Sequence, residues 1–293
     1  MKINLKQLTI DDLDRFSSYF SRYTQLISEY TFTNLFVWND SRQISYALMD
    51  EGVIICADSY GELFYMPPVG FNNNRLIVSS LLENGQNNGI LPSIRRADER
   101  FISDLNGFHL IEMPDHYDYV YHLSDLSHLP GRNFKNKRGF VRKFMSNYDY
   151  EFVPYESRYR NDCIELIERW IESKNSADIE NYSGLSEYNA MKKMFEYHDI
   201  LPVQTGLILI DGKVAAFSSG ERLNNNTFVV HFEKADTKFV GIYQAINQLF
   251  AKTITSENTE FINREQDLGL EGLRKAKRSY NPVRMIKKYQ ISL

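Results

Sequence analysis

Residues 206–218, Gly-Leu-Ile-Leu-Ile-Asp-Gly-Lys-Val-Ala-Ala-Phe-Ser, decide the fold that this sequence predicts. Two apolar runs flank the dipeptide Asp211-Gly212, which is a strong signal for the turn of a β-hairpin. A second turn, Asn224–Asn226, precedes another strand-like run, Thr227–Phe232. The stretch therefore predicts three consecutive antiparallel strands.

Helices are predicted on both sides of these strands. Asp162–Ser173 has apolar residues at helical spacing, and Glu187–His198 follows as a second helix. After the three strands, Gly241–Thr253 reads as a helix and Thr259–Ile262 as a short strand. The order is typical of a domain in which helices cover a mixed sheet.

The first half of the chain shows a similar order of elements. A helix is expected after the start signal Thr9–Asp12. Strands are expected at 43–49, 53–57, 62–66 and 118–123, the hairpin turn at 50–52, and helices at 76–82 and 97–105. The repeat is one of order and not of sequence identity. It predicts an α+β protein with two similar domains, 1–130 and 156–293, joined by a basic segment at 131–155.

Composition narrows the class of protein. The chain has 293 residues and 43% hydrophobic residues, as expected for a folded globular protein. Its net charge of −4 does not suggest a nucleic-acid binder as a whole. The two cysteines, Cys56 and Cys163, provide neither a disulfide framework nor metal-ligand spacing. With no signal peptide or transmembrane run recognisable in the sequence, a cytoplasmic protein without a metal is expected.

The segment Phe261–Pro282 carries the strongest functional signal. A short apolar strand is followed by a dense alternation of carboxylates, glycines and cations. Its polar members include Asn263, Glu265, Asp267, Arg274, Lys275, Lys277 and Arg278. Such a mixture after a buried strand is often a site for a charged substrate.

Three blocks carry a resemblance to a known family: 121–138, 230–247 and 263–282. They resemble a family of uncharacterised bacterial proteins that is grouped with the C-terminal catalytic domain of phosphatidylglycerol lysyltransferases. The resemblance implies two tandem GNAT-like domains, of the acyl-CoA N-acyltransferase type, with mixed central sheets flanked by helices. It also implies transfer of an aminoacyl group from aminoacyl-tRNA to a lipid head group or a peptide.

The chain departs from the related proteins in two ways. The lysyltransferases carry a large membrane-embedded part, and none is expected from these 293 residues. A typical acetyl-CoA site has a glycine-rich loop before its helix, whereas Thr237–Tyr243 contains a single glycine. This weakens the prediction of a pyrophosphate cradle, because close backbone approach favours glycine.

Aminoacyl transfer needs groups that orient an amine or hydroxyl, remove its proton and stabilise an oxyanion. Asp267 is the first candidate, to position the α-ammonium of the aminoacyl group or to accept a proton. Capping of a helix that begins near Gly269 is its alternative role. Lys277 and Arg274 are candidates for holding phosphate or oxyanion charge, and a solvated helix face is the alternative for them.

His231 and Glu233 are two residues apart on a predicted strand and should point to one side. They are a candidate general base with its orienting partner, or else a polar pair with a structural role. Tyr243 could donate a hydrogen bond to substrate, although packing is the more common role for such a residue. Asn263 and Tyr280 complete the expected substrate-binding set.

The basic segment has three interpretations: a solvated helix face, a contact with the phosphate backbone of tRNA, or a contact with an anionic membrane surface. The predicted phosphate contacts are Arg132, Lys135, Lys137, Arg138 and Arg142.

The expected function is acyl transfer by the C-terminal half. The donor would be charged tRNA, and the acceptor a small amine or hydroxyl compound or a lipid head group at the membrane periphery. No further cofactor is expected. An acetyl-CoA-dependent N-acetyltransferase and a non-catalytic binding module for a charged metabolite or RNA are the alternatives.

Overall fold

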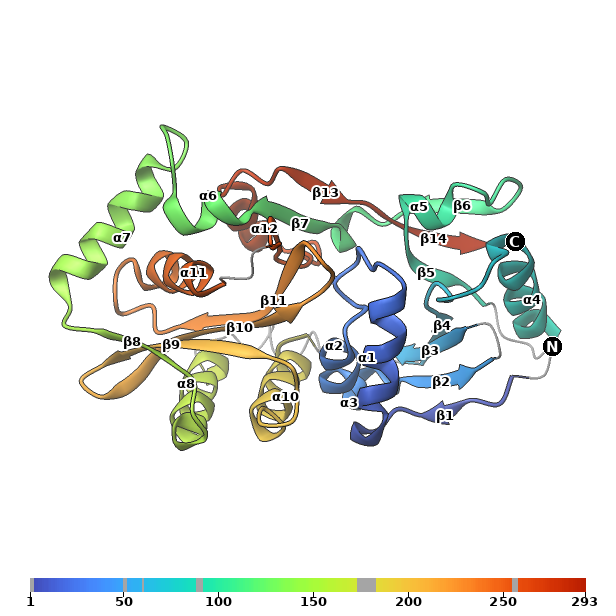
Figure 1. Cartoon of the computed structure of the whole chain (residues 1–293), viewed down its shortest axis with the longest axis horizontal. Coiled ribbons are helices and arrows are strands. Elements are labelled where there is room, and N and C mark those ends of the chain that lie inside the picture. Colours follow the sequence, from blue (N-terminus) through green and yellow to red (C-terminus); the bar gives the residue numbers. More distant parts are fainter. Residues whose placement is uncertain (1–2, 50–51, 60, 88–91, 173–182, 255–257) are drawn as a thin grey trace. The chain divides into compact units, whose positions relative to one another are not determined.

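The computed structural model describes residues 3–49, 52–59, 61–87, 92–172, 183–254 and 258–293. The chain forms two compact units, which are described separately. Unit 1 comprises Met1–Asp118, Gln266–Arg274 and Met285–Leu293, and unit 2 comprises Tyr119–Glu265 and Lys275–Arg284. Figure 1 labels the helices and strands of both units.

Unit 1 is built on a sheet with the strand order β1-β2-β3-β4-β5-β14-β6. Strands β1 to β4 are antiparallel, β4 and β5 are parallel, and β14 is antiparallel to both β5 and β6. The strands are β1 (Lys6–Gln7), β2 (Ser45–Leu48), β3 (Val53–Ser59), β4 (Glu62–Tyr65), β5 (Ile94–Asp98), β6 (His109–Glu112) and β14 (Lys288–Ser292).

The expected start of the first helix is confirmed. The backbone N–H of Thr9 donates to the Asp12 carboxylate at 3.0 Å, which satisfies one of the free donors at a helix start. The helical elements of unit 1 are η1 (Ile10–Asp12), α1 (Leu13–Arg22), α2 (Phe32–Val37), α3 (Asn39–Arg42), α4 (Asn74–Asn87), α5 (Glu99–Ile102) and η2 (Pro114–His116).

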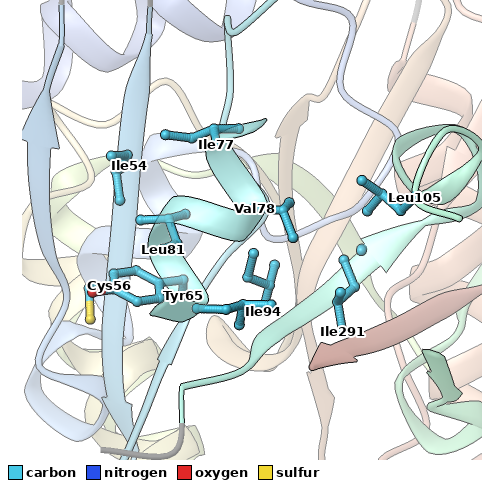
Figure 2. Close-up of a cluster of buried hydrophobic side chains, with 11 residues drawn as sticks. Ile54, Cys56, Tyr65, Ile77, Val78, Leu81, Ile94, Leu105 and Ile291 are labelled. Atoms are coloured by element: carbon cyan, nitrogen blue, oxygen red, sulfur yellow. The ribbon is translucent and has the colours of Figure 1, made fainter. Parts of the chain in front are cut away.

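Helix α4 supplies one side of a core in unit 1. Its residues Ile77, Val78 and Leu81 pack with strand residues that include Ile54 and Ile94 (Figure 2). Because α4 connects the parallel strands β4 and β5, this packing fixes the crossover against the sheet.

The prediction of a helix at 97–105 is largely wrong. Residues 94–98 form strand β5, and only Glu99–Ile102 are helical. Ile94 and Ala97 are fully buried, and β5 pairs with β14, about 190 residues later in the sequence. A distant partner that local periodicity does not reveal decides the conformation here. The predicted hairpin turn includes Asp50 and Glu51, which lie outside the described residues.

Unit 2 is built on a sheet with the order β13-β7-β12-β11-β10-β9-β8. Strands β8 to β11 are antiparallel, β11 and β12 are parallel, and β12 and β7 are antiparallel. The strands are β7 (Asp118–His122), β8 (Glu151–Pro154), β9 (Gln204–Ile210), β10 (Lys213–Arg222), β11 (Thr227–Ala235), β12 (Phe261–Asn263) and β13 (Arg284–Ile286).

Helices cover both faces of this second sheet. Helices α8 and α10 pack together on one face, and α11 lies on the other (Figure 1). The helical elements are α6 (Leu123–His128), α7 (Lys135–Asn147), η3 (Ser157–Tyr159), α8 (Arg160–Glu172), α10 (Ser183–Glu196), α11 (Ile242–Thr253) and α12 (Glu271–Arg278). The three predicted strands around Asp211-Gly212 are therefore confirmed as β9, β10 and β11.

The two sheets have one topology, which confirms the repeat in element order. In each sheet, the first four strands in order are antiparallel to their neighbours. The fifth strand is parallel to the fourth, to which a helix connects it, and the sixth strand is antiparallel to the fifth. The sixth strands are β14, from the C-terminus, and β7, from the middle of the chain. The units are thus discontinuous in sequence, unlike the contiguous ranges 1–130 and 156–293. The segment 131–155 forms α7 and β8 within unit 2.

Among the described residues, no helix combines the length and apolar character needed to cross a membrane.

Candidate functional site

The candidate site in unit 2 lies where the parallel strands β11 and β12 end. Their ladder runs from the pair Thr227–Phe261 to the pair Val229–Asn263, and β11 continues to Ala235. Ligands of sheets with parallel strands commonly bind at the carboxyl ends of those strands. Residues 230–235 and the segment after Asn263 are therefore expected to contain ligand-binding or catalytic side chains.

His231 lies between two carboxylates at this end of β11. Its Nδ1 is 2.7 Å from Glu265 Oε1, and its Nε2 is 2.9 Å from Glu221 Oε1. Burial by itself would lower the pKa of His231, but the hydrogen bonds to Glu221 and Glu265 outweigh it and raise the pKa to about 9. Because carboxylates only accept, His231 is an imidazolium that donates on both sides. A cationic ring at neutral pH holds the two carboxylates and does not act as a general base.

Glu233 has different partners from those that the sequence predicts. Its carboxylate accepts from Arg264 Nη2 at 2.9 Å and Asn247 Nδ2 at 3.3 Å, and Ser218 Oγ is 3.5 Å away. Burial disfavours the charge of Arg264, but Glu233 raises its pKa above the usual value. The pair joins β11 to the residue that follows β12, which fits a positioning role for Glu233.

Glu265 belongs to the polar run that the sequence indicates after Phe261, although the sequence predicts no particular role for it. Its backbone has φ 54°, a left-handed conformation that non-glycine residues adopt rarely and that persists where the surroundings or a function require it. Its N–H donates to the buried Asn263 Oδ1 at 2.8 Å, and its side chain is 15% exposed. Asn263 thus shapes the loop that presents Glu265. Glu221, at the end of β10, gave no sequence signal.

Lys277 stabilises the loop that contains Arg264 and Glu265. Its Nζ donates to the carbonyl oxygen of Arg264, and its own carbonyl oxygen accepts from Tyr121 Oη at 2.8 Å. Tyr280 is buried, which raises the pKa of its hydroxyl, and Lys137 Nζ lies 4.0 Å from the centre of its ring. These contacts favour positioning roles for Lys277 and Tyr280.

Asp267 and Arg274 belong to unit 1. Asp267 is 1% exposed, and its Oδ1 accepts from the backbone N–H of Gly269 at 2.9 Å. Arg274 binds both of its oxygens and also donates to Asp115 Oδ1 at 2.6 Å. This is close to the capping alternative, because the carboxylate braces the turn that leads into α12.

Tyr243 packs in the first turn of α11, against the core that includes Ile242 and Ile246. Burial raises the pKa of Tyr243 to about 12. Its surroundings agree with the packing role.

Some cations of the basic segment 131–155 bind other groups of the protein, and others face solvent. Arg138 donates to the carbonyl oxygens of Leu129 and Gly131, so it closes the turn after α6. Lys137 donates to Ser279 Oγ at 2.6 Å, and burial lowers the pKa of its ammonium. Arg132, Lys135 and Arg142 are exposed, with Lys143 and the half-exposed ring of Phe140 beside them in α7 or its approach.

The single glycine of the loop before α11 has a packing role. Gly241 has φ 92°, and a Cβ atom there would lie 2.3 Å from the carbonyl oxygen of Phe140 and 3.2 Å from Phe144 Cβ. The absent side chain makes room for α7. The loop therefore gives no evidence of the close backbone approach that a pyrophosphate cradle uses.

The part of the chain that the structure describes contains no group of three or more His, Cys, Asp or Glu side chains placed to hold a metal ion.

Two sheets of the same strand order, each with its parallel pair at the same place, define a tandem GNAT-like protein of the α+β class. The family described as "Phosphatidylglycerol lysyltransferase, C-terminal" matches residues 20–292, and the chain belongs to this family. Family and fold together place the chain among transferases of the acyltransferase type.

Solved structures with similar folds agree with this family assignment. A conserved protein of unknown function from Bacteroides thetaiotaomicron VPI-5482 is 31% identical, with a TM-score of 0.91 over 100% of both chains. L-PGS from Bacillus licheniformis is 14% identical, with a TM-score of 0.69 over 98% of this chain and 92% of its own. FemX is 8% identical, with a TM-score of 0.59 over 99% of this chain and 98% of its own. The last two show the shared fold. No curated protein matches the sequence.

Proposed function

We propose that this protein transfers an aminoacyl group from charged tRNA to an amine or hydroxyl acceptor, such as a lipid head group. The family supports acyl transfer, and the site in unit 2 supports a cationic acyl group. Because charged tRNA is made in the cytoplasm, the proposal places the protein's work there, at the membrane periphery if the acceptor is a lipid.

The observation that carries the proposal is the arrangement of Glu265. Its carboxylate is fixed at the carboxyl end of β12 by His231 and presented by a left-handed backbone that Asn263 stabilises. A fixed, partly exposed carboxylate is a suitable partner for the α-ammonium of an aminoacyl ester. An acetyl group carries no such charge.

The loop before α11 supports the same choice of donor. Gly241, the single glycine of this loop, makes room for Phe140 and Phe144. The loop therefore offers little of the close backbone approach that a pyrophosphate needs. We therefore favour aminoacyl-tRNA over acetyl-CoA.

In the proposed reaction the acceptor's nitrogen or oxygen attacks the ester carbonyl carbon. The new bond forms as the ester C–O bond to the tRNA breaks, and the proton lost by the acceptor ends on the released 3′-terminal ribose hydroxyl. Glu265 would orient the aminoacyl group, while Glu233, Arg264 and Lys277 keep the loop in place. Arg132, Lys135 and Arg142 would contact tRNA phosphates.

The test is transfer of radiolabelled amino acid from a mixed pool of charged tRNA to cell lipids and small molecules. Wild type is compared with Glu265→Gln and with Glu260→Gln. Glu260 is a matched control, because it lies at the start of the same segment and its side chain is 58% exposed. Among the described residues, its side chain forms a long ion pair with His122 at 4.0 Å.

We expect a labelled product with wild type and with Glu260→Gln, and a rate at least about tenfold lower with Glu265→Gln, since a hydrogen bond between charged groups contributes more than a neutral one. Equal activity of Glu265→Gln and wild type would remove Glu265 from the site. Absence of transfer with every amino acid, together with binding of acetyl-CoA, would favour the acetyltransferase.

A further inference from the structure

Unit 1 contains a pocket of about 370 Å³ that the proposed function does not use. It is lined by Ser59, Glu62, Phe64, Arg95, Arg96, Met113 and His116. Its volume falls within the range of small-molecule sites. Two consecutive arginines, Arg95 and Arg96, contribute to its lining, although successive side chains of a regular strand point to opposite faces.

Arg95 and Arg96 form a β-bulge in β5. In the ladder with β14, Ala97 pairs with Tyr289 and Ile94 with Ile291, so two residues of β5 lie opposite the single residue Gln290. Arg96 takes φ 72°, the left-handed region that favours glycine. A non-glycine residue there costs energy and persists where the surroundings or a function require it.

The bulge places both guanidinium groups beside the Phe64 ring. Successive side chains of a regular strand point to opposite faces, whereas here both groups lie beside one ring. The guanidinium carbons of Arg95 and Arg96 are 5.1 Å and 5.7 Å from the centre of the Phe64 ring. Two like charges held beside one ring are favourable when an anion lies between them.

Both arginines have a carboxylate neighbour, and the partner of Arg95 is exposed to solvent. Arg95 Nη1 donates to Glu62 Oε2 at 2.7 Å, but Glu62 is 67% exposed. Glu29 Oε1 is 3.5 Å from Arg96 Nε, and Glu29 is already bonded by Lys288 Nζ at 2.6 Å and by Gln266 Nε2 at 2.9 Å. The buried Lys288 also donates to Asp118 at 2.7 Å, so the two carboxylates Glu29 and Asp118 balance the charges of Lys288 and Arg96.

Two buried polar atoms at this pocket form no hydrogen bond among the described residues: His116 Nδ1, and Arg96 Nε, which is in an ion pair with Glu29 Oε1 at 3.5 Å. Burial and the neighbouring charge of Arg96 lower the pKa of His116 to about 4, so its ring is neutral at pH 7. Buried polar atoms without a protein partner are usually satisfied by water or a ligand. Phe64 and Met113 add an apolar wall, which suits an organic group attached to the anion.

We propose that this pocket binds the phosphate group of a small anionic metabolite. The forked donors of Arg95 and Arg96 match a phosphate, and Ser59 and His116 supply further polar contacts beside it. The site belongs to unit 1 alone and is independent of acyl transfer in unit 2.

The test is calorimetric titration of the whole protein with glycerol 3-phosphate at fixed ionic strength. Arg95→Gln should weaken binding at least about tenfold, since a charged hydrogen-bond donor is removed. Glu62→Gln should strengthen binding by a few fold, because it frees Arg95 from a competing exposed carboxylate. Arg100→Gln is the matched control, an exposed arginine in the adjacent helix α5 that pairs with Asp98 at 3.4 Å, and it should bind as wild type does.

A second arm uses phosphatidylglycerol vesicles. Saturable binding of glycerol 3-phosphate that Arg95→Gln weakens and Glu62→Gln strengthens would support the proposal. No saturable binding, or equal effects of Arg95→Gln and Arg100→Gln, would overturn it. Binding of vesicles alone would also overturn it, because the phosphate would then come from a lipid surface. Since Glu62 is exposed, its variant keeps the test decisive even if Arg95→Gln folds poorly.

Discussion

Arg274 holds Asp267 with two hydrogen bonds: Nε donates to Oδ2 at 2.9 Å, and Nη2 donates to Oδ1 at 2.8 Å. The carboxylate is 1% exposed and also accepts from the N–H of Gly269. Its geometry is that of a brace for the turn before α12, and we therefore assign Asp267 a positioning role.

Replacing Asp267 should lower stability. Asp267→Asn removes the charge that Arg274 binds, and we expect a loss of roughly 1–3 kcal/mol in the free energy of unfolding, because a buried hydrogen-bond network is left incomplete. Urea denaturation measures it. Glu271→Gln, an exposed change in the first turn of α12, is the control and should be neutral. Unchanged stability of Asp267→Asn would argue for a direct role with substrate.

His231 predicts a dependence of stability on pH. Its pKa is about 9 in the folded protein and about 6.5 in an unfolded chain. The stabilisation is therefore fully present below about pH 6.5 and is lost as the pH rises toward 9, with a total on the order of 3 kcal/mol. Urea unfolding between pH 6 and 9.5 should show this fall for wild type and for the control His128→Gln, which changes an exposed histidine. His231→Gln should be less stable at pH 6 and should not show this fall as the pH rises toward 9. An equally steep fall in His231→Gln would contradict the imidazolium assignment.

Gly241 offers a test of the loop before α11. Gly241→Ala should destabilise by roughly 1–3 kcal/mol from backbone strain, with a further cost from the contact with Phe140. Gly131→Ala is the matched control, since it also has positive φ but nothing within 4 Å of its Cβ position. A thermal melt should rank Gly241→Ala below Gly131→Ala. If the two melt alike and only donor binding suffers at Gly241, the glycine would have a ligand-binding role.

The exposed cations of α7 predict salt-dependent binding of tRNA. Each phosphate contact that is lost should reduce the slope of log K against log salt by roughly 0.7–0.9. Lys135→Gln combined with Arg142→Gln should thus reduce the slope by about 1.4–1.8. The control combines Lys213→Gln and Lys252→Gln, two exposed cations elsewhere in unit 2, and should keep the wild-type slope. Binding that does not respond to salt would remove the phosphate contacts.

Much of the fold could be predicted because its signals are local. Asp211-Gly212 between two apolar runs specifies a hairpin, and the helical spacing of Cys163, Leu166 and Ile167 specifies α8. Strand β5 could not be predicted, because its partner β14 is distant in sequence and its bulge at Arg95 and Arg96 breaks the alternation that marks a strand.

The candidate site was predictable in position but less so in detail. The polar run after Phe261 did indicate the right segment, since carboxylates and cations behind a short apolar strand are readable in one dimension. The partners of His231 were not readable, because Glu221 and Glu265 come from different elements that only the sheet brings together.

The sequence alone therefore determined the α+β class, the repeated order of elements and the family, because these depend on local periodicity, turn residues and motif order. Only the tertiary structure decided that β7 joins the second sheet and β14 the first, that His231 is cationic between two carboxylates, and that Arg95 and Arg96 lie beside one ring. The physical reason is that strand pairing, burial and the resulting pKa depend on residues far apart in the chain, whose approach is specified by the packing of the whole sheet.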